Sequence, residues 1–234
     1  MQAGEKRILP EVTLADARYD ASCRCCPRLA SFLDEVRAGH PEYWCRPVPP
    51  LGEVAAPLLI VGLAPGMHGA NASGRPFTGD YAGILLYQTL YDYGYANQPV
   101  ADAVGDGLVL SGCRISNAVK CLPPQNKPLP IEIATCNDFL AADLADLPAG
   151  AAVLALGRIA HEATLRAMKL RLRDFPFAHG ARHELQRPAG AAVMFDSYHC
   201  SRYNTNTRRL TPDMFRSVFG AIAGYLGHAA RARA

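Results

Sequence analysis

The chain has 234 residues and a net charge of +3, and half of its residues are hydrophobic. This composition excludes a disordered chain, because enough apolar side chains are present to bury a core. No apolar run reaches the ~20 residues that cross a bilayer, and the opening MQAGEKRILPEV lacks the apolar stretch of a secretory signal. We therefore predict one cytosolic domain, residues 1–234, without a membrane segment.

Apolar periodicity and breaker residues predict short strands that alternate with helices. The expected helices are residues 25–39, 81–93, 131–145, 158–169 and 211–226, and the expected strands are residues 58–62, 113–120, 151–157 and 191–199. Asp80 and Thr211 precede two helices as N-cap residues, and Pro130 suits the first turn of a third. The alternation predicts an α/β fold, a three-layer α/β/α sandwich around a mostly parallel central sheet.

A glycine-rich segment, GLAPGMHGANASGRPFTGD at residues 62–80, follows the first expected strand. Ligand sites of parallel sheets lie beyond the carboxyl ends of the strands. We therefore expect this segment, Asn117 and His199 to meet at one edge of the sheet. Its glycines, which include Gly66 and Gly69, allow backbone amides to come close to a phosphate or a base.

Four of the eight cysteines have a spacing typical of metal ligands. Cys23 and Cys26 form a C-x-x-C pair, and Cys121 and Cys136 form a wider pair. A reducing cytosol disfavours disulfides, and thiolates suit an iron–sulfur cluster or a closed zinc site. Burial as ordinary core residues is the alternative for these four. Cys25, Cys45, Cys113 and Cys200 remain, and Cys113 is expected in the core of a strand.

The segments CPRL, GLAPGMHGANASGRPFTGD, SNAVKC and SYHCSRYNTNTRRLT, in this order, resemble the family 5 (type B) uracil-DNA glycosylases of prokaryotes. The resemblance covers nearly the whole chain from about Cys23. It implies an α/β/α sandwich and a structural [4Fe–4S] cluster, whose ligands would be Cys23, Cys26, Cys121 and Cys136, the first two in an amino-terminal segment of about residues 20–50. It also implies removal of uracil and of other deaminated or damaged bases from DNA.

Two positions depart from related sequences. Leu63 stands where related glycosylase families carry an acidic residue, so it cannot activate water. Cys200 stands where a proline often follows the histidine, which loosens the backbone of the expected DNA-contacting loop.

Hydrolysis of an N-glycosidic bond needs a positioned water, negative charge near the sugar and stabilisation of the departing base. Asp80 is our candidate to orient water and stabilise the sugar cation, and a helix cap is its alternative role. Asn117 carries the donor and acceptor that read a pyrimidine edge, with a turn-stabilising role as the alternative. His199 is expected to stabilise the leaving base, against a purely structural role.

The target base must rotate out of the duplex to be reached. We expect Gly62, Ala64, Gly66, Asn71 and Phe77 to form the base pocket, with a core position as the alternative for Phe77. The expected DNA-binding residues follow the histidine: Ser201, Arg202, Tyr203, Asn204, Arg208 and Arg209. Their arginines suit phosphates, and Tyr203 or a neighbour could fill the gap left by the base. An ordinary solvated surface is the alternative for the arginines.

Two other classes of function compete with this hypothesis. A non-catalytic, metal-containing module that binds DNA lesions would share the cysteines and the arginines. A small-molecule phosphate or nucleotide hydrolase could use GLAPG as an anion loop, but the loop lacks the lysine of a P-loop. The expected partner is DNA that contains uracil or deaminated bases, bound by a monomer, and the sequence leaves the preferred lesion and strand context open.

Overall fold

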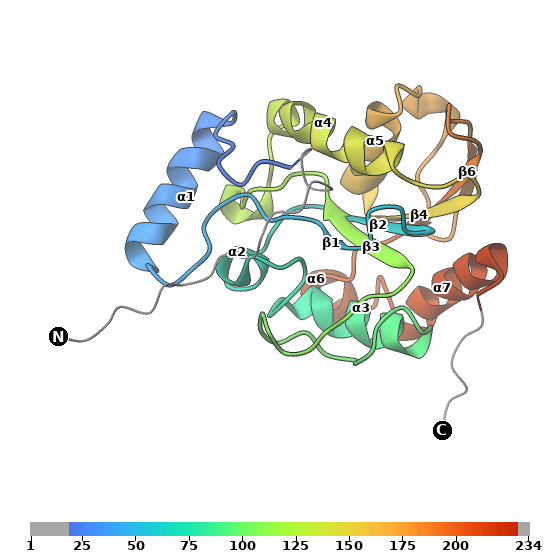
Figure 1. Cartoon of the computed structure of the whole chain (residues 1–234), viewed down its shortest axis with the longest axis horizontal. Helices are drawn as coiled ribbons and strands as arrows, with labels where there is room; N and C mark the ends of the chain where they lie inside the picture. Colours follow the sequence, from blue (N-terminus) through green and yellow to red (C-terminus); the bar gives the residue numbers. More distant parts are fainter. Residues whose placement is uncertain (1–18, 229–234) are drawn as a thin grey trace.

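The computed structural model describes residues 19–228 (Figure 1). The opening MQAGEKRILPEV, which entered the prediction of location, lies outside these residues. Between residues 19 and 228, none of the helices combines the length and the apolar character needed to span a bilayer.

The centre of the structure is a six-stranded sheet with the order β1-β3-β2-β4-β6-β5. Its strands are β1 (Leu51–Gly52), β2 (Leu58–Gly62), β3 (Cys113–Asn117), β4 (Ala151–Leu156), β5 (Arg182–Leu185) and β6 (Ala192–Ser197). The four inner strands pair in parallel, whereas β1 and β5 pair antiparallel at the two edges. The predicted mostly parallel sheet is therefore confirmed. All four predicted strands are the inner ones.

The helices are α1 (Pro27–Gly39), α2 (Ala70–Ser73), α3 (Tyr81–Asp92), α4 (Pro130–Ala145), α5 (Arg158–Ala167), α6 (Arg202–Asn206) and α7 (Pro212–Leu226). Two short 3₁₀ turns, Pro124–Asn126 and Leu172–Asp174, complete the elements. The five predicted helices agree with α1, α3, α4, α5 and α7 to within two residues. Thr211 caps α7 as predicted, because its side chain accepts a hydrogen bond from the amide of Met214 at 3.2 Å.

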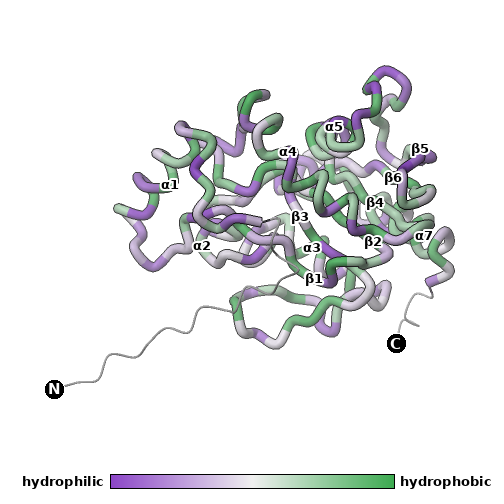
Figure 2. The backbone as a smooth tube through the Cα atoms, turned by 45° about the horizontal axis from the view of Figure 1, so that its top comes forward, coloured by the Kyte–Doolittle hydropathy of each residue, from purple (hydrophilic) through white to green (hydrophobic). Residues whose placement is uncertain are grey.

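Helices cover both faces of the sheet, α4 and α5 on one side and α3 and α7 on the other (Figure 1). A hydrophobic cluster lies on each face. Leu58 and Ile60 of β2 pack in the cluster that contains residues of α3 and α7. Leu59 and Val61 of the same strand pack in the cluster that contains residues of α4 and α5. This alternation along a strand buried on both faces gives the three-layer sandwich expected from the sequence. In Figure 2 the inner strands run through hydrophobic segments, and much of the hydrophilic colour lies on peripheral loops.

The carboxyl ends of the inner strands lie at one edge of the sheet. Gly62 pairs with Asn117 at the ends of β2 and β3, and Leu156 pairs with Ser197 at the ends of β4 and β6. The loops that follow all four strands therefore meet, and His199 is two residues beyond β6.

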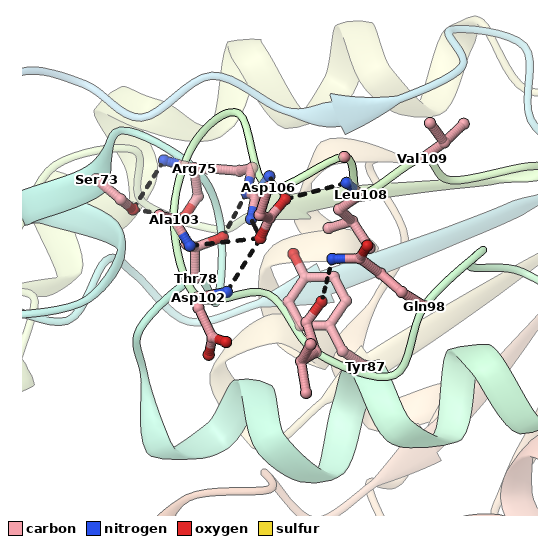
Figure 3. A network of polar contacts seen from close by, with 12 residues as sticks. Ser73, Arg75, Thr78, Tyr87, Gln98, Asp102, Ala103, Asp106, Leu108 and Val109 are labelled. Carbon is pink, nitrogen blue, oxygen red and sulfur yellow. Dashed lines mark hydrogen bonds and ion pairs between the residues drawn. The ribbon is translucent and has the colours of Figure 1, made fainter.

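The glycine-rich segment 62–80 is held in place by a network of polar contacts (Figure 3). Arg75 donates to both carboxylate oxygens of Asp106 at 2.9 and 2.6 Å, and its Nε donates to Thr78 at 2.6 Å. Asp106 also accepts the amides of Asp102 and Leu108. The pKa of Asp106 is held below its usual range, above all by the hydrogen bonds from Arg75. The segment is thus anchored to the loop of residues 97–110.

Candidate active site

A cavity of about 430 Å³ opens where the strand ends meet. Its wall includes all three predicted catalytic residues, Asp80, Asn117 and His199. These residues come from the start of α3, the end of β3 and the segment after β6. The topology of the parallel sheet therefore brings together three side chains that are far apart in the sequence.

Asp80 precedes α3, but its side chain makes no hydrogen bond that caps the helix. The expected capping contact is therefore wrong, because the carboxylate turns back to the glycine-rich segment. It accepts the amide of Ala70 at 3.0 Å and the amide of Gly66. Burial raises the pKa of Asp80, and these two amides oppose the rise.

The glycines of this segment make room for that carboxylate. A Cβ atom on Gly66 would come within 2.2 Å of Asp80 Oδ1, and one on Gly69 would come within 2.1 Å of Asp80 Cγ. Side chains never approach so closely, so a side chain at either position would displace the carboxylate. With glycine there, the backbone amides can come within bonding distance of the acid.

Asn117 is 3 % exposed and lines the cavity. Its Oδ1 has no hydrogen-bond partner among residues 19–228. The atom is close to Gly62, where a Cβ would come within 2.3 Å of it and within 2.8 Å of the Phe77 ring. An unpartnered buried acceptor is costly unless a ligand supplies the donor. The alternative role, in stabilising a turn, does not use this atom.

His199 and Phe77 form an aromatic wall of the cavity. Their ring centroids are 6.1 Å apart with planes inclined by 24°. Burial lowers the pKa of His199 to about 4, so its imidazole is neutral at physiological pH. Its buried Nδ1 has no partner in the described part of the chain. The carbonyl of His199 accepts the side-chain amide of Asn204 at 2.8 Å, which holds the residue in position.

Comparison with known proteins relates most of the chain to one family of enzymes. The family model of the uracil DNA glycosylase superfamily matches residues 49–223. A type-5 uracil-DNA glycosylase of Thermus thermophilus is 46% identical over 202 residues, which cover 84% of this chain and 90% of that protein. The chain belongs to the type-5 uracil-DNA glycosylases.

More distant relatives agree with this assignment. A type-5 uracil-DNA glycosylase of Pyrobaculum aerophilum is 38% identical over 88% of this chain and 90% of its own length. A type-4 uracil-DNA glycosylase of Archaeoglobus fulgidus is 29% identical over 65% of this chain and 69% of its own length. The resemblance to family 5 drawn from the sequence segments is therefore confirmed.

The predicted base-pocket residues of this glycosylase do not all reach the cavity. Ala64, Gly66 and Phe77 line it, and so does Leu63. Gly62 lies behind the wall, against Asn117 and Phe77. Asn71 is not part of the wall, because its fully buried amide points to Cys45 and donates to its sulfur at 3.5 Å.

Three of the predicted DNA-binding residues, Arg202, Tyr203 and Asn204, lie in a short helix, α6, where the sequence led us to expect a loop. Ser201 caps this helix by accepting the amide of Asn204 at 3.4 Å. Ser201 and Arg202 line the cavity, and the Arg202 guanidinium is 4.9 Å from the ring centroid of Tyr81. Tyr203 is 71 % exposed. Arg208 is exposed. The Cζ atom of the Arg209 guanidinium lies 4.6 Å from the ring centroid of Tyr198.

The sequence reasoning missed two polar residues of the cavity wall, Asn126 and Arg158. Asn126 follows Gln125, and both have left-handed backbone angles, with φ of 56°. Such angles are uncommon in residues other than glycine and mark a strained turn. Arg158 begins α5 directly after β4, at the expected edge of the sheet. That position after a strand end was the signal that could have identified it.

The four predicted cysteine ligands surround a second cavity, of about 290 Å³. Cys23, Cys26, Cys121 and Cys136 all line it, together with the exposed Cys25. Burial raises the pKa of Cys26 to about 11 and also raises that of Cys121, and the neighbouring cysteines add to both shifts. The remaining Cys45, Cys113 and Cys200 are buried in the hydrophobic core. The type-5 family and this grouping are compatible with an iron–sulfur cluster.

The spacing of the sulfurs also bears on the choice of metal. In the described residues, no three cysteine sulfurs lie within 4.8 Å of one another. Four thiolates on one zinc ion would be about 3.8 Å apart, from a zinc–sulfur bond of about 2.3 Å. The described cysteine sulfurs are therefore not grouped as closely as the ligands of one zinc ion.

A third group of metal-ligand types is His161, His183 and Asp196. Asp196 lies between the two imidazoles, 2.8 Å from Nδ1 of His161 and 3.1 Å from Nε2 of His183. The other nitrogen of His161 is 2.9 Å from the carbonyl of Phe175. The network therefore joins α5, β5 and β6 by hydrogen bonds of its own.

Proposed function

We propose that the protein removes uracil, and other deaminated or damaged bases, from DNA by hydrolysing the N-glycosidic bond and leaving an abasic site. The observation that carries this proposal is the single cavity lined by Asp80, Asn117 and His199 in a chain of the type-5 uracil-DNA glycosylases. Its volume is in the range of sites that enclose a small ligand. Its position at the strand ends is where such folds bind ligands.

The base is proposed to enter this cavity after rotation out of the duplex. Asn117 would read its edge, because the unpartnered Oδ1 can accept the N3–H of uracil. The rings of Phe77 and His199 provide aromatic surface beside the base. Leu63 and Ala64 add an apolar wall that excludes water from the glycosidic bond.

Asp80 is proposed to orient the attacking water and to stabilise the positive charge that develops on the sugar. The amides of Ala70 and Gly66 fix the orientation of the carboxylate without neutralising its charge. The carboxylate also lines the cavity, where a substrate sugar would lie.

His199 is proposed to donate a hydrogen bond to O2 of the departing base while its imidazole stays neutral. Its low pKa favours this form, because an imidazolium would be costly at this buried site. A neutral donor stabilises the negative charge of the leaving base without protonating it first.

The cluster site is proposed to hold a [4Fe–4S] cluster on Cys23, Cys26, Cys121 and Cys136. A cluster bound there would link the start of α1 to the segment from β3 to α4, and hydrolysis needs no electron transfer. The grouping of the four cysteines around one cavity and their soft thiolate donors support this assignment.

The DNA duplex is proposed to run across α6 and the residues that follow it. Arg202, Arg208 and Arg209 would meet phosphates, and the exposed Tyr203 would occupy the space left by the base. Arg158 adds a positive charge at the cavity itself. The cytosolic location, the monomeric state and the single domain expected from the sequence stay predictions.

The decisive experiment incubates the protein with a duplex that carries one uracil and then cleaves abasic sites with alkali. We expect strand cleavage at the uracil with the wild type and none with Asp80→Asn. A panel with hypoxanthine and xanthine in duplex and single strands then defines the lesion range. Tight binding without abasic sites would instead support the lesion-binding module.

A further inference from the structure

The loop between β3 and α4 brings a polar segment to the rim of the base cavity. Asn126 is part of the cavity wall, and both Asn126 and Lys127 are exposed. The side chains of these two residues have no hydrogen-bond or ion-pair partner among residues 19–228. An amide and an ammonium group at the entrance of the cavity are therefore available to a ligand. We call Asn126 and Lys127 the rim pair.

The backbone of this loop has an uncommon conformation. Gln125 and Asn126 both have a φ of 56°, in the left-handed region that residues other than glycine rarely adopt. Asparagine tolerates this region, because its short side chain can bond locally, whereas glutamine has no such advantage. Backbone strain of this kind is concentrated at binding and active sites. The turn therefore indicates that the position of Asn126 in the cavity wall has a function.

Surrounding contacts hold the loop in this conformation. The amide of Lys127 donates to the carbonyl of Pro124 at 3.1 Å. Arg28 of α1 donates to the carbonyl of Lys127 at 3.2 Å and to both carboxylate oxygens of Glu132 at 2.7 Å. Glu132 also accepts the amide of Leu129 at 2.7 Å. The loop is fixed before a ligand arrives, so binding costs little conformational entropy.

The charge of the segment favours an anionic ligand. Residues 118–131 contain no acidic side chain. The side chain of Glu132 is 4 % exposed and is engaged in the ion pair just described. Arg158 and Arg202 add two cations to the wall of the same cavity. An exposed lysine beside an amide donor, without a free acid in the same segment, suits a phosphate.

The rim pair and α6 reach the cavity from different parts of the sheet. The loop with Asn126 follows β3, whereas Arg202 of α6 follows β6. β2 and β4 lie between these two strands in the sheet. Both segments nevertheless line one cavity. A DNA strand whose extruded nucleotide fills this cavity continues on both sides of it, so a contact with α6 leaves the side of β3 to another group.

We propose that the rim pair binds a phosphate of the DNA strand next to the extruded nucleotide. The side-chain amide of Asn126 donates to a phosphate oxygen, and Lys127 supplies the opposite charge. The base itself stays with Asn117, which is only 3 % exposed and lies deeper in the cavity. The inference rests on the proposed function, because it takes DNA as the substrate, and it adds a second backbone contact across the cavity from α6.

Binding to a duplex with a tetrahydrofuran abasic site tests the contact, since this DNA has the backbone without a base and is not hydrolysed. Asn126→Gly removes the amide and keeps the turn, which glycine adopts without strain. Its Kd should rise about tenfold, the effect of losing one hydrogen bond to a charged group. Gln125→Gly is the matched control, because this exposed residue has the same φ and lies outside the cavity wall. Equal Kd values for the two variants would overturn the contact of Asn126.

Two further substitutions test the charge of the ligand. In Lys127→Met the slope of log K against log salt should fall by about 0.9, the contribution of one phosphate contact. An unchanged slope would remove Lys127 from the site. Asn126→Asp keeps a residue that tolerates the left-handed turn, but it places a negative charge beside the phosphate. It should bind more weakly than Asn126→Gly, and binding as tight as that of the wild type would contradict the proposal.

An uncharged methylphosphonate, placed in turn at each linkage beside the abasic site, locates the phosphate. At one linkage it should weaken binding by the wild type but not by Asn126→Gly, which has already lost the contact. Equal losses in both proteins at every linkage would overturn the assignment to a phosphate.

These measurements need binding alone, so they separate this inference from the proposed function. A wild type that binds the duplex without excising uracil would refute the proposed function and leave the contact of the rim pair measurable. A wild type that excises uracil, together with rim-pair variants that bind DNA normally, would refute this inference alone.

Discussion

The carboxylate of Asp80 occupies the space that a side chain on Gly69 would need, since a Cβ at that position would come within 2.1 Å of Cγ. The acid and the glycine are therefore one structural unit, although eleven positions separate them in the sequence. This relationship makes the orientation of the acid testable without changing the acid itself.

Gly69→Ala should displace the Asp80 carboxylate and slow uracil excision by about a hundredfold, because a misplaced catalytic group loses most of its effect. The measurement is the single-turnover rate on a uracil duplex. Gly39→Ala is the matched control, since a Cβ there meets no atom within 4 Å. A Gly69→Ala enzyme as fast as the control would contradict the role assigned to Asp80.

The pH dependence of excision should report Asp80 and not His199. Burial raises the pKa of Asp80, and the ionised carboxylate is the active form, so activity is lost as the pH falls through that raised value. The acid limb should therefore lie above the ordinary carboxylate value of about 3.9. His199, with a pKa of about 4, is already neutral in this range.

The measurement is the single-turnover rate between about pH 4 and 9. A limb near the ordinary histidine value of about 6.5 that disappears in His199→Gln would contradict this prediction.

The stability of the protein gives a second check on the raised pKa of Asp80. Because the pKa of Asp80 is higher in the folded state, ionising its carboxyl group as the pH rises lowers the stability of the fold. At neutral pH the uncharged side chain of Asp80→Asn avoids this cost, so the variant should melt no lower than the wild type.

The sequence could predict much of this site, because parallel strands place their carboxyl ends together. Asn117 and His199 end or follow strands whose apolar pattern is clear, and Asp80 directly precedes an apolar helix. The true partners of the Asp80 carboxylate were not predictable, since the amides of Ala70 and Gly66 come from the folded path of an irregular segment. The same holds for Asn71, whose amide turns to Cys45.

The elements that the sequence did not predict are short or lie at an edge. β1 has two residues, and β5 is largely exposed on the outside of the sheet, so neither has a strong apolar pattern. α2 and α6 have four and five residues and are held by surrounding contacts. Isolated helices of this length are not stable, so propensity cannot identify them.

Asn117→Ala should change the choice of base more than the rate of cleavage. The variant loses the acceptor for the N3–H of uracil, which discriminates between bases that carry a donor or an acceptor at that edge. Excision measured for uracil and for cytosine, whose N3 is an acceptor, should show rates that differ less than they do in the wild type. An unaltered ratio of these two rates would mean that Asn117 does not read the base.

Arg208→Ala should weaken DNA binding and reduce the salt dependence of the Kd. A phosphate contact contributes roughly 0.9 to the slope of log K against log salt, so the slope should fall by about that amount. Titrations at several salt concentrations measure it. Arg173→Ala, an exposed arginine outside this group, serves as the control. Equal slopes for the two variants would remove Arg208 from the interface.

Cys121→Ala should lose iron, whereas Cys25→Ala should keep it, although both cysteines line the same cavity. Iron content and the visible absorption of the purified proteins distinguish the two variants. Without the cluster, the link between the start of α1 and α4 is lost, so we expect a lower melting temperature for Cys121→Ala alone. Full iron content in that variant would rule out Cys121 as a ligand.

The two cavities are completed at different points along the sequence, which has a consequence for truncated chains. The cysteine cavity is complete by residue 139, whereas the base cavity needs residues 199 to 202 as well. A fragment truncated before β6 would therefore contain all residues of the cysteine cavity but lack part of the base site. It would also present β4, which is buried along its whole length in the intact protein, as an unpaired apolar edge. Such an edge invites aggregation, so we expect chains truncated at this point to be less soluble than the intact protein.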